Sequence, residues 1–167
     1  MSDKGVVAVG VLPALERAVR LVERWRANAD RGRLAELRRL GKGVMPGESF
    51  FVIADAMQAT RHEEEFLLRF LPLAAMARHR PGLRPGVAFK AAEISSTRFE
   101  RWLRSPAHVA VEQSRALIRR CEALDVVRLG RLLYRWSDSD RLTLAREFYR
   151  QAPTKTGAPV PTIMTSE

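Results

Sequence analysis

The chain has 167 residues, of which 46% are apolar, and a formal net charge of +10, which fits one compact domain or two small subdomains with a buried core. The single cysteine, Cys121, excludes a disulfide framework, and no stretch reaches the roughly 18 to 20 apolar residues of a membrane-spanning helix. Because no convincing signal-peptide cleavage pattern follows the short apolar run at the start, the prediction is a cytoplasmic protein.

Most of the positive charge comes from arginine, because only four of the 29 basic residues are lysine. Arginine pairs with phosphate through a planar fork and is weakly hydrated, which favours contact with nucleic acid. A genome rich in G and C would also favour arginine over lysine, but it would not by itself produce the net charge. The charge therefore indicates an acidic partner.

The first two predicted helices are read from apolar residues at three- and four-residue spacing. Pro13 stands in the first turn of one, and Asp30 is placed to cap the other, which ends at the glycine-rich segment 41–43. Arginines of the second helix project away from its leucines: Arg31, Arg38 and Arg39, with Arg33 at its start. For any one of them, a solvated helix face explains the pattern as well as a binding role does.

Two more helices are predicted after Pro46-Gly47, and the first of them is mostly apolar. Thr60 and Glu63 form a capping box that opens the second. Arg61 lies at the positive N-terminus of that helix, where a phosphate would be stabilised. Pro72 falls inside the same helix and predicts a kink or a break.

Residues 79–95 contain two Pro-Gly pairs, which mark a loop with about one helical turn. The basic residues of this segment make it either a linker or a segment that becomes ordered on binding. The boundary between two subdomains is predicted here.

Two helices with basic stripes are predicted after this loop. A capping box from Thr97 to Glu100 is expected to open a short helix, whose arginines recur at three-residue spacing: Arg98, Arg101 and Arg104. Ser105-Pro106 then predicts a long helix over 107–124. Its outer face carries Arg115 and Arg119, with Arg120 beside them. Because the stripes belong to consecutive helices, folding could merge them into one band.

Residues 124–151 predict a helical hairpin. The apolar face of its first helix consists of Val126, Leu129, Leu132, Leu133 and Trp136. Ser137 and Asp140 then resemble a capping box, with Asp in place of the usual Glu. The second helix is predicted to bury Leu142, Ala145, Phe148 and Tyr149 and to expose Arg141, Arg146 and Arg150.

These elements predict an all-α fold of two small helical-bundle subdomains packed together. The N-terminal subdomain is expected over 1–80, the connecting loop over 81–95 and the C-terminal bundle over 96–152. A tail rich in Pro and Thr, 153–167, is expected to be disordered. No segment shows the period-two alternation of a strand.

The sequence offers no catalytic or metal site. The three histidines and Cys121 are scattered without ligand spacing, and there is no glycine-rich phosphate loop. The larger aromatics (Trp25, Trp102, Trp136 and Phe148) fall on apolar helix faces, which favours core burial over base stacking. The chain is therefore predicted to be non-enzymatic, without a metal or cofactor, and to contact a nucleic-acid backbone through its cations.

Three motifs in one order carry a family resemblance: RGRLAELRRL near the N-terminus, ISSTRFERWLRS in the middle, and LLYRW with LAREFY near the end. This order resembles the CasB family, the small subunit of the type I-E CRISPR surveillance complex called Cascade. The resemblance covers roughly residues 12 to 150. It implies a non-enzymatic, all-helical subunit that sits as a pair along the belly of Cascade.

The resemblance also implies partners and a basic groove. The expected partners are the large and backbone subunits, the crRNA, the target DNA with its displaced strand, and a second copy of the chain. The residues that match the family's groove are Arg33, Arg38, Arg39, Arg61, Arg101, Arg104, Arg115 and Arg119, with Arg120 and Arg141 as weaker matches. Arg38 or Arg39 is alternatively expected in an internal ion pair. Ser105-Pro106-Ala107-His108 departs from the more charged connection of the family, which puts the contact made there in doubt.

Two other functions fit the residues. One is a helical interaction adaptor whose arginines meet acidic proteins. The other is a free-standing helical DNA-binding regulator, which is less favoured because the helix after Ser137 presents few base-reading side chains.

Overall fold

The computed structural model describes residues 11–41 and 43–150, and most of this part of the chain is helical. The elements in chain order are α1 (Val11–Ala27), α2 (Arg31–Arg39), α3 (Glu48–Met57), α4 (Arg61–Met76), β1 (Arg78–His79), α5 (Pro85–Ala91), α6 (Ser96–Leu103), α7 (Ala107–Ile118), β2 (Ala123–Leu124), α8 (Val126–Arg135) and α9 (Asp138–Tyr149). The predicted all-α class is confirmed. The predicted disordered tail, 153–167, and Lys42 of the predicted helix end lie outside the described residues.

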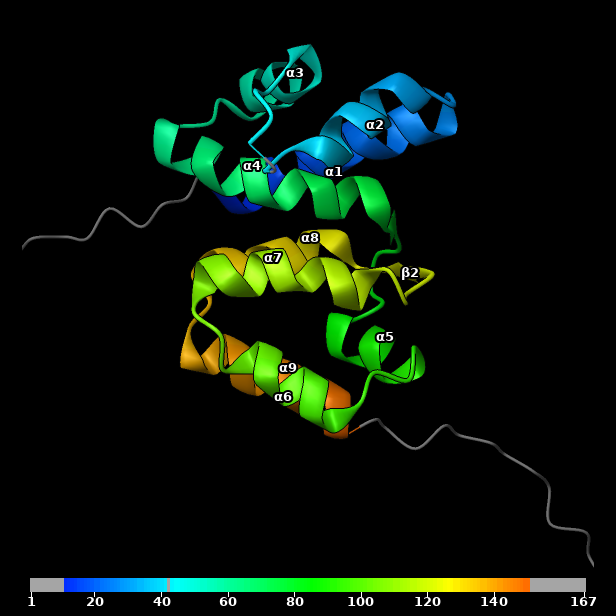
Figure 1. Ribbon diagram of the computed structural model, residues 1–167, viewed down its shortest axis with the longest axis vertical. Helices are drawn as coiled ribbons and strands as arrows, with labels where there is room; N and C mark the ends of the chain where they lie inside the picture. Colours follow the sequence, from blue (N-terminus) through cyan, green and yellow to red (C-terminus); the bar gives the residue numbers. More distant parts are fainter. Residues whose placement is uncertain (1–10, 42, 151–167) are drawn as a thin grey trace, which may run out of the picture.

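The helices stack in layers, which Figure 1 shows from top to bottom. Helices α2 and α3 form the first layer and cover α1 and α4. Helix α1 packs on α8, and α4 packs on α7. Helices α5, α6 and α9 form the layer at the other end. One continuous apolar cluster runs through all these layers, from Leu15 in α1 to Phe148 in α9. Helices of the two predicted subdomains therefore pack directly against each other.

The apolar faces that the sequence predicted are largely buried. Each of the five apolar residues predicted for α8, from Val126 to Trp136, is at most 5% exposed. The four aromatics expected in the core, including Trp25 and Trp102, are also buried. The core is thus built from helix faces, each of which can be predicted from the apolar spacing within its own helix.

Three of the five predicted N-terminal caps have the expected geometry, whereas the cap at Ser105 is wrong, because Pro106 is the N-cap of α7 and makes no side-chain cap hydrogen bond. The Asp30 carboxylate accepts from the backbone N–H of Arg33, and the boxes at Thr60 and Ser137 are complete. The predicted box at Thr97 is wrong. The cap lies two residues earlier, at Ser95, whose hydroxyl accepts from the backbone N–H of Arg98, and the helix begins at Ser96.

Helix α4 is not broken at Pro72, which is buried inside it. Its C-terminal carbonyls find partners outside the helix. The Arg26 guanidinium donates to the carbonyls of Ala74 and Ala75, and Arg38 also donates to Ala75. Two arginines therefore cap this helix end, where cations are favoured.

The long helix predicted over 107–124 is wrong, because α7 ends at Ile118. Ala123–Leu124 instead forms a strand that pairs in parallel with Arg78–His79. The backbone N–H of Arg80 donates to Leu124, and the His79 ring accepts from the N–H of Val126. The expectation of no strand is thus also wrong, since segments this short carry no visible alternation.

The buried face of α9 differs from the prediction. Leu142 and Tyr149 are about half exposed, at 51% and 49%, whereas the carboxylate residue Glu147 is only 4% exposed. Glu147 accepts from the backbone N–H of Gly86 and pairs with Arg128. The buried face of α9 therefore includes a carboxylate that is paired with the partly exposed Arg128, and not only apolar side chains.

The segment predicted as a loop with one helical turn contains the full helix α5, which packs against α9. In the part of the chain that the structure describes, no helix is both long and apolar enough to cross a membrane.

Candidate nucleic-acid interface

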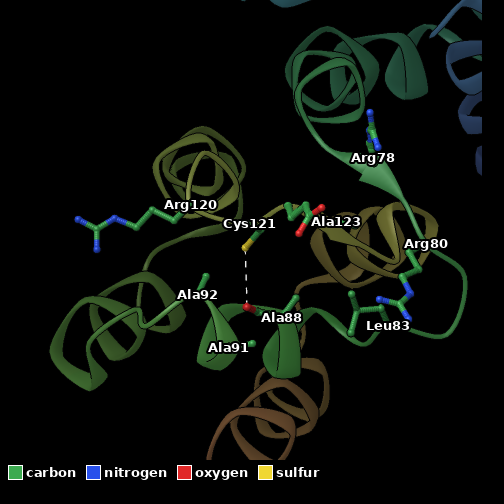
Figure 2. Close-up of a pocket in the computed structure, with 10 residues that line it drawn as sticks. Arg78, Arg80, Leu83, Ala88, Ala91, Ala92, Arg120, Cys121 and Ala123 are labelled. Carbon is green, nitrogen blue, oxygen red and sulfur yellow. Dashed lines mark hydrogen bonds between the residues drawn. The ribbon is translucent and has the colours of Figure 1, made fainter. Parts of the chain in front are cut away.

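Three arginines from two separate segments border one hollow of about 600 Å³. Arg78 and Arg80 belong to β1 and the residue after it, and Arg120 follows the end of α7. Figure 2 shows Arg78 and Arg80 on one side of the hollow and Arg120 on the other, with Arg120 pointing outward. The parallel pair of strands creates this arrangement, because it holds the segments after α4 and α7 side by side.

The floor of this hollow is made of small and apolar side chains. Ala88, Ala91 and Ala92 of α5 and its C-cap face Cys121, whose sulfur lies 3.9 Å from the carbonyl oxygen of Ala88. Glu122 is the acidic residue of the lining. With three guanidinium groups against one carboxylate, the hollow is suited to an anion that lies across it.

Further arginines continue the positive charge along the face of α4 and α7. Arg69 and Arg115 border a second hollow of about 250 Å³, together with Gly41 and Glu112. The Arg115 guanidinium donates to the carbonyl of Leu40 at a distance of 2.9 Å. This bond connects the C-cap of α2 with the last turn of α7.

Arg115 and Arg119 are electrostatic neighbours. Burial lowers the pKa of Arg115, and the nearby positive charge of Arg119 lowers this pKa further, while Glu112 opposes both effects. Two like charges at this spacing repel each other in the free protein. An anion bound beside them would relieve that repulsion.

We call these residues the basic band: Arg69, Arg78, Arg80, Arg115, Arg119 and Arg120. Three of them (Arg115, Arg119 and Arg120) were predicted from the sequence. Arg39 is exposed and stands next to Leu40 in the chain. Among residues 11–41 and 43–150, no carboxylate lies within ion-pair distance of any member of the band.

Other predicted arginines are held by neighbouring side chains or by backbone carbonyls. Arg33 pairs with Asp30 at 3.5 Å and lies over the ring of Trp25. Arg141 similarly pairs with Asp138 at 3.6 Å and lies over Trp136. Arg38 belongs to the cap of α4 described above, so its role is structural.

Arg101 and Arg104 lie before the start of α7, and Arg61 is the first residue of α4, about two turns before Arg69. Arg104 pairs loosely with Glu100 at 3.8 Å and precedes the start of α7, whereas Arg119 follows its end. A helix of that length is about 18 Å long. The structure therefore does not merge the α6 stripe with the far end of α7.

Arg69, Arg78 and Arg80 were missed by the sequence interpretation. Arg69 belongs to α4, whose sequence is mostly apolar and indicates burial. Arg78 and Arg80 are placed beside Arg120 by the pairing of β1 with β2. The short basic run 78–80 was the available signal.

Searches against protein-family models, curated proteins and solved structures found no significant match to this chain. Within the described ranges, no group of three His, Cys, Asp or Glu side chains is placed to hold a metal ion.

Cys121 is expected to be a poor nucleophile. Burial raises the pKa of its thiol to about 11, and the thiolate is the reactive form. An unperturbed thiol has a pKa of about 8.5, so at pH 8 the unfolded chain contains far more thiolate than the folded protein. Alkylation of the folded protein by iodoacetamide at this pH should therefore be at least about tenfold slower than alkylation of the unfolded chain. The folded rate should rise steadily as the pH approaches 11. Equal rates in the folded and unfolded protein would contradict this assignment.

Proposed function

We propose that the protein is the non-catalytic small subunit of a type I-E CRISPR surveillance complex in the cytoplasm. In this role its basic band holds the displaced non-target DNA strand and steadies the paired crRNA and target strand. The partners are the large and backbone subunits, the crRNA, the target DNA and a second copy of the chain. Both the ordered sequence motifs and the charge of the band support this proposal.

The observation that carries the proposal is the absence of carboxylate partners along the band, in the part of the chain that the structure describes. Guanidinium groups neutralised inside the protein contribute little to binding of phosphate, whereas unneutralised ones release counterions when phosphates replace them. Both hollows border the C-terminal part of α7, because Arg115 of its last turn lines the second hollow and Arg120, just after its end, lines the first.

The mechanism is electrostatic. Replacing a DNA duplex by an RNA–DNA duplex is nearly balanced in free energy, so contacts to the displaced backbone can favour the open state. Such contacts carry no base specificity and weaken as salt rises. Helices packed on one core provide the rigid support, and no covalent step is required.

The test is binding of the full chain to single-stranded DNA of scrambled sequence across a salt series. The logarithm of affinity should fall with the logarithm of salt with a slope of roughly −0.7 per neutralised phosphate. In the variant Arg78→Gln/Arg80→Gln/Arg119→Gln/Arg120→Gln, the slope should become less negative by up to about 2.8. Fluorescence anisotropy of a labelled strand measures both slopes.

The matched control is Arg17→Gln/Arg24→Gln/Arg146→Gln/Arg150→Gln, which removes the same charge from exposed residues of α1 and α9 and of the position after α9. Its slope should stay close to that of the unmodified protein. Equal changes in the two variants would show that net charge alone governs binding. Co-purification with a guide RNA and the other subunits separates this function from that of an adaptor for acidic proteins.

A further inference from the structure

A hollow of about 250 Å³ lies between α4, α7 and α8, on the side of Arg69 away from the second hollow of the band. Its polar and aromatic lining is His62, Phe66, Arg69, His108 and Tyr134. Its apolar base includes Val111 and Leu133, which are 3% and 1% exposed. A concave site with an apolar base and a few polar groups is typical of a pocket for a small planar group.

The aromatic rings of this hollow form a cluster with free surface. Tyr134 meets Phe66 edge to face, with ring centroids 5.1 Å apart and an interplanar angle of 85°. Phe66 stacks on the buried Phe70, and His62 approaches the other side of the cluster at 6.5 Å from Tyr134. Phe66 and Tyr134 are each only partly buried, and His62 is exposed. Ring surface therefore remains available for stacking.

Arg69 connects this hollow to the basic band. Its side chain lines both the aromatic hollow and the hollow that contains Arg115. Proteins that bind single-stranded nucleic acids combine these two elements, because cations follow the phosphates while aromatic rings stack on unpaired bases. Glu65 also lines the aromatic hollow, and its carboxylate is a hydrogen-bond acceptor.

We propose that the aromatic hollow takes one unstacked nucleobase of a bound single strand, with the adjoining phosphate between Arg69 and Arg115. This inference rests on the proposed function, and it adds a stacking contact to binding that would otherwise follow the backbone alone. A protein side chain is a poorer match, because the hollow opens beside Arg69, which has no carboxylate within ion-pair distance among the described residues.

The test compares two labelled oligonucleotides of equal length, one of thymidine and one of abasic sites, which carry the same phosphates. Because bases stack on protein aromatics, the thymidine strand should bind about tenfold more tightly, which corresponds to about 1.4 kcal/mol. In Tyr134→Leu this ratio should fall to within about twofold, while affinity for the abasic strand stays unchanged.

Two further variants separate the role of the hollow from effects on folding. His62→Ala/His108→Ala changes only exposed side chains and should also lower the ratio, by about threefold. Tyr149→Leu removes the tyrosine of α9, outside the hollow, and should leave the ratio unchanged.

Equal, salt-sensitive binding of both strands by the unmodified protein would overturn the base pocket and leave the proposed function standing. So would a ratio that persists in Tyr134→Leu and in the histidine variant. If neither strand binds at low salt, the proposed function is overturned and the pocket with it.

Discussion

Replacing Trp102 by alanine is expected to lower the free energy of unfolding by about 4 kcal/mol, the range for removing a large buried aromatic side chain. Trp102 is 2% exposed and packs against Phe89, Phe99 and Trp136, with ring centroids 5.1 to 5.8 Å away. Its indole N–H also donates to the carbonyl of Ala110 at 2.9 Å. The substitution leaves a cavity where α5, α6, α7 and α8 meet.

Urea unfolding followed by circular dichroism measures this loss, with Trp102→Phe as the comparison. Phenylalanine keeps most of the apolar contact but cannot donate to Ala110 or to the Ser114 hydroxyl. Its cost should be smaller, about 2 kcal/mol. If alanine and phenylalanine cost the same, packing would not be the main contribution of this side chain.

Replacing Gly86 by alanine is expected to cost about 3 kcal/mol, the upper part of the range for adding atoms to a packed core. An added Cβ would lie 2.5 Å from the Cβ of Glu147, 2.7 Å from the Leu144 carbonyl oxygen and 2.9 Å from the Phe148 nitrogen. Two of these atoms belong to the backbone of α9, so neither helix can yield by a change of rotamer. The added methyl must push α5 away from α9.

The control is Gly32→Ala in α2, where the nearest atom to an added Cβ is the Asp30 carboxylate oxygen at 3.9 Å. Because alanine is the better helix former, this change should stabilise the protein by up to about 1 kcal/mol. Thermal unfolding of both variants gives the comparison. A Gly86→Ala protein as stable as the unmodified one would show that α5 does not pack closely on α9.

The helices themselves follow from local sequence. Leucine and aromatic residues at helical spacing predicted the buried face of α8, and short polar signals at Asp30, Thr60 and Ser137 located helix starts to the residue. Each of these signals acts within one or two helical turns. That is the range over which a single sequence is informative.

Features that depend on distant segments were not predictable in this way. The end of α7 at Ile118 depends on a strand pair formed with residues far earlier in the chain. The burial of Glu147 depends on partners in α5 and α8, Gly86 and Arg128. The periodicity of a sequence predicts on which face of a helix a residue lies, but it does not predict which other element that face packs against.

The same limit applies to the arginines. Arg38 and Arg39 are neighbours with the same pattern and are both exposed, yet Arg38 donates to the Ala75 carbonyl at the end of α4. Arg33 and Arg141 were assigned to a groove, but each has a carboxylate and an aromatic ring beside it. Arg115 and Arg119 were assigned correctly to one helix face, because their spacing alone places them together.

The pairing of β1 with β2 has a thermodynamic consequence for recognition. Main-chain hydrogen bonds fix the positions from which Arg78, Arg80 and Arg120 extend, including the bond from Arg80 to Leu124. A ligand therefore has only to restrict side-chain rotamers there, at roughly 0.5–1.5 kcal/mol for each side chain, and does not have to order a loop as well. If the protein binds a strand as proposed, this preorganisation means that binding requires no rearrangement of the backbone at these arginines.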